Sequence, residues 1–139
     1  MRKTENYREH HRDIRLIISD IKHSLSSDNI DNDPENIALH TRKLFGKFGT
    51  HLAIEDKAFY PKAINHPNTK LSKLARQFQD EMGGLGEAFH TYKQKWPGPI
   101  AISKNPNGFV KETQEIIFLL EKRLEREEGE LYELYDQVM

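Results

Sequence analysis

His51 and Glu55 stand four positions apart in the segment HLAIEDKAFYP, residues 51–61. Side chains at this spacing lie one turn apart on the same face of a helix. An imidazole and a carboxylate together suit iron, manganese or zinc, and carboxylates can also bridge two ions. The same pair also fits a buried, hydrogen-bonded salt bridge, so the spacing alone leaves a metal ligand pair and a structural pair both open.

Three further polar residues, His11, Arg123 and Glu127, also fall on helix faces that are otherwise apolar. Charged groups rarely occupy a protein core unless they are paired. One such residue is ordinary, but five spread over three helices indicate that they meet. Arg123 and Glu127 repeat the spacing of His51 and Glu55. Antiparallel packing can bring these layers to one level inside a helical bundle.

The elements that would carry these residues are helical, because apolar residues recur at steps of three and four and no segment alternates with period two. We expect a first helix over 5–27 and a second that begins at Pro34, is capped by Asp33, and stops before Pro61. A third helix should begin at Asn68 or Thr69 and end at Trp96, and a fourth should run from Val110 to the C-terminus. The polar loop SSDNIDNDP and the break over 97–108 separate them, and no internal repeat stands out. The prediction is an all-α, antiparallel up-down-up-down four-helix bundle forming a single domain over residues 1–139.

Glycine is unusually frequent inside these expected helices. Six of the eight glycines fall there, at Gly46, Gly49, Gly83, Gly84, Gly86 and Gly129. Each costs about 1 kcal/mol relative to alanine in a helix. We expect close helix packing or a local break to explain them, and the alternative is that they leave space beside a ligand pocket.

Composition excludes several classes of protein. The chain has no cysteine, which removes disulfides and thiolate metal sites, and its formal net charge of -1 argues against a nucleic-acid partner. No apolar run is long enough to span a membrane and the N-terminus lacks the pattern of a signal peptide, so we expect a cytoplasmic protein without a membrane partner. Trp96 and the following PGPIAI predict an exposed apolar patch and a homodimer contact. No nucleophile–base pair or phosphate-binding loop is present, which favours a non-enzymatic role without settling it.

The pattern resembles the hemerythrin-like family, also called the HHE cation-binding domain, over nearly the whole chain. EHHRDIR resembles the family's first helix, in a register that selects His11 rather than His10, and HLAIEDKAFYP resembles its second. DEMGGLGEAF and RLEREEGELYELY stand at the third and fourth. The resemblance implies a bundle that holds a non-haem di-iron centre, in proteins that carry or sense oxygen, handle iron, or respond to nitric oxide and peroxide.

Two positions depart from the family. Met82 and Arg123 stand where histidine ligands are expected, whereas the others match: His11, His51, Glu55 and Glu127, with Glu81 as a weaker match beside Met82. Arginine cannot bind a cation, and methionine is a poor ligand for iron in an oxygen-rich site. A full di-iron centre is therefore not expected.

Two alternatives follow from these departures. In the favoured one, Arg123 replaces a metal as the cation that ties the helices together, and the domain is a regulatory or binding module with reduced or lost metal binding. In the other, Arg123 points away, and His11, His51, Glu55 and Glu127 hold one or two iron ions for sensing or storage. A metal ion or a small diatomic molecule is then the expected ligand.

Overall fold

The computed structural model describes residues 2–138, and its elements are helical throughout. They are listed in chain order: α1 (Glu5–Ser24), α2 (Ser27–Asn32), α3 (Pro34–Ile54), η1 (Glu55–Phe59), α4 (Tyr60–Ile64), α5 (Thr69–Lys95), α6 (Pro99–Lys104), α7 (Pro106–Arg126), η2 (Glu127–Leu131) and α8 (Tyr132–Val138). The prediction of an all-α chain is confirmed. No helix within residues 2–138 is both long and apolar enough to cross a lipid bilayer.

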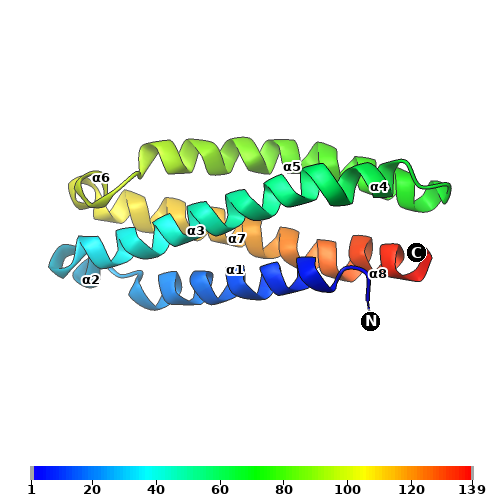
Figure 1. Ribbon diagram of the computed structural model, residues 1–139. Helices are drawn as coiled ribbons and strands as arrows, with labels where there is room; N and C mark the ends of the chain where they lie inside the picture. The colour runs from blue at the N-terminus through cyan, green and yellow to red at the C-terminus, as the bar shows by residue number, and fades with distance from the viewer. Residues whose placement is uncertain (1, 139) are drawn as a thin grey trace.

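Four long segments of the described chain lie side by side: α1, α3–α4, α5 and α7–α8 (Figure 1). The short helices α2 and α6 lie together at one end, and the start of α1 and the end of α8 lie toward the other. The helix starts follow local sequence. Asp33 accepts a hydrogen bond from the Asn36 amide at the start of α3, as predicted, and Asn68 and Asn105 cap α5 and α7 in the same way.

Two loops expected from the sequence contain short helices instead. α1 ends at Ser24 rather than residue 27, and α2 follows within the polar segment. α6 occupies the middle of the expected loop 97–108, where it begins at Pro99. Ile30 and Ile102 explain both differences, because each is fully buried and anchors its short helix to the end of the core.

The second long segment also continues past Pro61, where we expected it to stop. The π-helical turn η1 precedes the proline, and the Tyr60 amide donates to the Glu55 carbonyl across it. Pro61 then stands in the first turn of α4, where a missing N–H costs little. The segment therefore runs from Pro34 to Ile64 with one π turn inside it.

The buried apolar residues form two clusters along the bundle. One includes Ile14, Phe48 and Leu124, and the other includes Phe59, Phe78 and Tyr132. Of the buried polar residues in the described chain, five lie close to one another and form what we call the polar layer: His11, His51, Glu55, Arg123 and Glu127.

The expected apolar patch after the third long helix is mostly buried. Trp96 is 2% exposed and Ile102 is fully covered, whereas Ile100 is 73% exposed. Trp96 packs edge-on against Phe109 at the start of α7, with ring centroids 5.4 Å apart. The exposed part of the predicted patch is therefore Pro97 and Ile100, and the dimer contact stays a prediction.

The glycines inside the helices are not explained by close packing. A Cβ atom would meet no heavy atom within 4 Å at Gly46, Gly49, Gly83, Gly84, Gly86 or Gly129. None of the described residues has a positive φ, and α5 runs unbroken through its three glycines. These glycines therefore cost helix stability without a packing or conformational gain that the structure shows.

Replacement of Gly83 by alanine should stabilise the protein by up to about 1 kcal/mol, because a methyl group fits there and restricts the unfolded chain. Chemical denaturation of both proteins measures this difference.

Gly108→Ala is the matched control, and it should lower the free energy of unfolding instead of raising it. A Cβ there would lie 2.4 Å from Nδ2 of Asn105, whose side chain caps α7 through the Gly108 amide. Loss of that cap should cost about 1 kcal/mol. Destabilisation by Gly83→Ala would contradict the interpretation that the site is unconstrained.

Candidate metal centre

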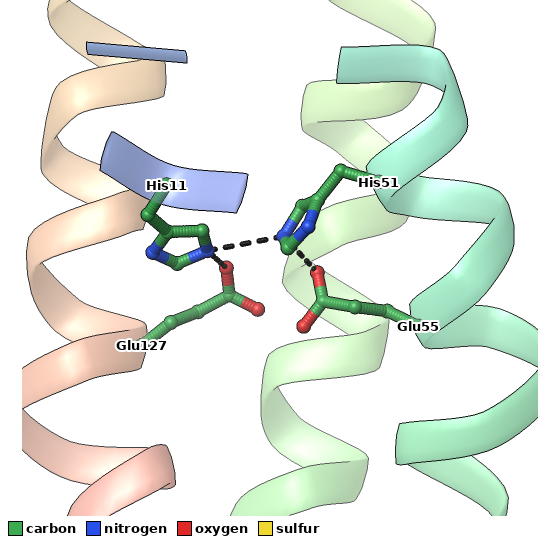
Figure 2. A group of neighbouring side chains, drawn as sticks. All are labelled: His11, His51, Glu55 and Glu127. Carbon is green, nitrogen blue, oxygen red and sulfur yellow. Dashed lines mark hydrogen bonds and ion pairs between the residues drawn. The ribbon is translucent and has the colours of Figure 1, made fainter. Parts of the chain in front are cut away.

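Four of the predicted ligands converge in the polar layer (Figure 2). His11 comes from α1 and His51 from the last turn of α3, while Glu55 and Glu127 are the first residues of η1 and η2. One ligand atom from each lies within 4.8 Å of the others. None of the four is more than 1% exposed. The structure thus brings together the four residues that the sequence singled out.

Their polar atoms face one another at short range. Nε2 of His51 is 2.7 Å from Oε1 of Glu55 and 3.0 Å from Nε2 of His11. Nε2 of His11 is in turn 3.4 Å from Oε1 of Glu127. Within residues 2–138, neither of these Oε1 atoms accepts a hydrogen bond of normal geometry, although both are buried. Buried acceptors without donors are uncommon in folded proteins.

This arrangement fits a divalent cation. Two imidazole nitrogens and two carboxylate oxygens are a donor set that suits iron, manganese or zinc. The unsatisfied Oε1 atoms of Glu55 and Glu127 point into the space between the rings, where a cation would satisfy both. The residues present therefore fit a single cation, which His11, His51, Glu55 and Glu127 would hold.

Two buried tyrosines hold the carboxylates in a crossed arrangement. The Tyr132 hydroxyl donates to Oε2 of Glu55 at 2.7 Å, and the Tyr60 hydroxyl donates to Oε2 of Glu127 at 2.8 Å. Each tyrosine thus supports the carboxylate of the other long segment. These bonds occupy the Oε2 atoms and leave both Oε1 atoms facing the imidazoles.

The two tyrosines belong to an internal repeat that the sequence analysis did not identify. His51, Glu55 and Tyr60 have the same spacing as Arg123, Glu127 and Tyr132. In both, the glutamate begins a π turn and the tyrosine follows it directly. The sequence contains this Glu-x4-Tyr spacing at two further places, Glu87/Tyr92 and Glu130/Tyr135. The motif alone therefore does not identify the repeat, whose role depends on the π turns.

Arg123 faces inward and lies on the far side of Glu127 from the imidazoles. The residue is 5% exposed, and its Nη2 donates to the Tyr60 hydroxyl at 2.8 Å and to the Phe78 carbonyl at 2.7 Å. Its Nε is 3.8 Å from Oε2 of Glu127. The alternative in which His11, His51, Glu55 and Glu127 hold iron assumed that Arg123 points away, and the structure does not meet that assumption. The inward guanidinium nonetheless leaves the four donors together.

The remaining candidates lie outside the group of four. Met82 is 8% exposed and packs in the apolar cluster, as expected for a core filler. The carboxylate of Glu81 is bound by Arg126 on the surface of the bundle and is 3.7 Å from Nη1 of Arg123. Glu81 thus contacts the outer side of Arg123 and does not join the two imidazoles.

The two carboxylates have opposite pKa shifts. Burial, together with the charge of Glu127, raises the pKa of Glu55 well above its usual value. Burial also opposes ionisation of Glu127, but its contact with His11 and the charge of Arg123 outweigh that effect and lower its pKa. Burial lowers the pKa of His51 and favours the neutral imidazole, which is the form that binds metals. The layer therefore holds one ionised carboxylate next to a permanent cation.

His10, which the helical register passed over in favour of His11, is half-buried and contacts this layer. Its Nδ1 lies 3.3 Å from Nδ1 of His51, and the two rings are nearly perpendicular. The helical period placed His10 off the inward face of α1. The period gives the direction of a side chain around its own helix, but it does not show how closely the neighbouring helix α3 packs against that side chain.

A family model described as the hemerythrin HHE cation binding domain matches residues 2–135. The matched region contains all four converging residues and both tyrosines. The comparisons with curated proteins and with solved structures gave no match.

Tyr132→Phe should lower the free energy of unfolding of the metal-free protein by about 1–3 kcal/mol, because it leaves a buried Glu55 oxygen without its donor. Urea denaturation measures the change. Tyr135→Phe is the matched control, since this ring packs on Phe59 with centroids 4.8 Å apart and no hydrogen bond joins its hydroxyl to the described polar layer. Equal effects of the two changes would contradict the role given to Tyr132.

Proposed function

Because this chain belongs to the hemerythrin HHE cation-binding domain family, we propose that it binds one divalent transition-metal cation through His11, His51, Glu55 and Glu127. Arg123 takes the place of a second cation. The proposal treats residues 1–139 as a single hemerythrin-like domain with an antiparallel up-down-up-down four-helix bundle. Iron is the metal that family membership favours.

The convergence of unsatisfied acceptors supports the proposal most directly. Oε1 of Glu55 and Oε1 of Glu127 are buried beside two imidazoles, and neither makes a hydrogen bond of normal geometry within the described chain. The tyrosines fix the opposite oxygen of each carboxylate, so both carboxylates are oriented in advance. A site that is already oriented loses less free energy when it binds a ligand.

Arg123 limits the site to one cation in this proposal. At a separation of about 5 Å and an effective dielectric constant of about 20, a guanidinium and a dication repel each other by roughly 6 to 7 kcal/mol. The hydrogen bonds from Arg123 to Tyr60 and to the Phe78 carbonyl hold it in place and oppose its withdrawal. The Met82 position adds no imidazole on the same side.

A single bound iron would supply redox chemistry and a position for a small diatomic ligand. The chain's own residues bind and orient: the imidazoles and carboxylates hold the cation, and the tyrosines position the carboxylates. The apolar clusters on both sides of the polar layer exclude water. These properties suit a sensing or binding module, and we propose that role rather than an enzymatic one.

A metal-free regulatory module is the second candidate, and the ion pair inside the polar layer favours it. Arg123 already places a positive charge beside Glu127, with Nε 3.8 Å from the carboxylate. That charge compensates the ionised glutamate in the absence of a metal. Metal binding distinguishes the two candidates.

Protein purified without chelator and reconstituted anaerobically with Fe²⁺ should bind about one equivalent, and His51→Ala should bind less than about a tenth of one, because a buried ligand is lost. Elemental analysis after gel filtration measures both values. Saturating metal at about 100 times its Kd should also stabilise the unmodified protein by about 2.7 kcal/mol. His23→Ala is the control, because His23 is exposed on the same helix as His11. Failure of the unmodified protein to bind Fe²⁺, Mn²⁺ or Zn²⁺ would support the metal-free module.

The double change Met82→His and Arg123→His should raise the metal content from about one equivalent to about two. It removes the guanidinium and adds imidazoles at the two positions where the family resemblance implies histidine ligands. Elemental analysis and the absorption of an oxo-bridged iron pair report the change. Two irons in the unmodified protein would contradict the place given to Arg123.

A further inference from the structure

We propose that His10 is a positioning residue for the metal ligand His51, and that it fixes the tautomer in which Nε2 of His51 is free to bind. This inference rests on the proposed cation site and adds a residue to it that is not one of its ligands. An imidazole that binds a metal through Nε2 carries its proton on Nδ1, and that proton needs an acceptor.

The two ring nitrogens of His51 have different contacts. Nε2 faces the site, 2.7 Å from Glu55 and 3.0 Å from His11. Nδ1 faces the opposite way, 3.3 Å from Nδ1 of His10. Within residues 2–138, this is the only hydrogen-bond contact of His51 Nδ1. Because His51 is 1% exposed, water does not replace the acceptor readily.

The geometry of His10 suits an acceptor. Its Nδ1 meets Nδ1 of His51 at 3.3 Å, and the two rings stand at 88° with centroids 5.4 Å apart, so a ring nitrogen of His10 is directed at His51. Tyr7 also packs against His10 with the two rings nearly perpendicular and their centroids 6.5 Å apart. A neutral His10 with its proton on Nε2 presents the Nδ1 lone pair to the His51 N–H.

The other imidazole ligand has a different outer neighbour. Nδ1 of His11 lies 3.7 Å from Oε2 of Glu128, a carboxylate that is bound by Arg15. A carboxylate is the common outer partner of a metal-bound histidine, whereas a second histidine accepts in only one tautomer. Of the adjacent pair, His11 is therefore a ligand, and His10 supports the ligand His51 on the facing helix α3.

The test compares His10→Phe, which removes the acceptor, with His10→Asn, whose amide oxygen can take the place of Nδ1. Co²⁺ is titrated into each metal-free protein, and its visible absorption gives the Kd. We expect His10→Phe to bind about 10–100-fold more weakly than the unmodified protein. His10→Asn should stay within about threefold of the unmodified protein, as should the control His23→Phe. Equal affinities for His10→Phe and the unmodified protein would overturn the proposal.

A second measurement does not depend on metal binding. Two-bond ¹H–¹⁵N correlation spectra of the metal-free, unmodified protein report which nitrogen of His51 carries the proton. We expect Nδ1–H in the unmodified protein and in His10→Asn, and a shift toward Nε2–H in His10→Phe. A proton on Nε2 in the unmodified protein would overturn the proposal, even where His10→Phe fails to fold. Absence of Co²⁺ binding by the unmodified protein would count against the cation site instead, and the tautomer of His51 would still decide the role of His10.

Discussion

An ionised carboxylate cannot remain in an apolar bundle without positive charge or hydrogen-bond donors around it, and Glu127 is the carboxylate that imposes this requirement here. Tyr60 donates to it, Arg123 lies beside it, and His11 approaches its other oxygen. Glu55 needs less positive charge around it, because burial raises its pKa and favours the neutral acid. The charge of the polar layer is thus organised around one glutamate, with the imidazoles on one side and the guanidinium on the other.

The two π turns place both glutamates at this level of the bundle. Each turn begins at a glutamate and ends before a tyrosine, and each adds one residue to a turn within a long helix. Such π turns often occur at functional sites, where they change the direction of the side chains that follow. Here each tyrosine reaches across to the opposite glutamate. The crossed bonds join the segments α3–α4 and α7–α8 and orient two carboxylates at once.

The polar layer is symmetric in its spacing but not in its chemistry. One repeat carries His51 and the other carries Arg123 at the corresponding position. The first can share a cation with its glutamate, whereas the second is itself a cation. This difference explains how one fold can retain a donor set for a metal while a guanidinium occupies the neighbouring position. It also explains why the structure is compatible with both a reduced site and a metal-free module, which differ in metal content rather than in architecture.

Period and spacing along the sequence were enough to predict the long helices, their apolar faces and the four converging donors, because they set the direction of a side chain around its own helix. The sequence also identified Met82 and Arg123 as departures from the family. The packing of the helices, which no local pattern reveals, turns Arg123 inward, lets Tyr60 and Tyr132 cross between segments, and brings His10 to His51. The tertiary structure also decided that the helix continues through Pro61. These features depend on how two helices are rotated and shifted against each other, and packing along the whole bundle sets that relation rather than any local run of residues.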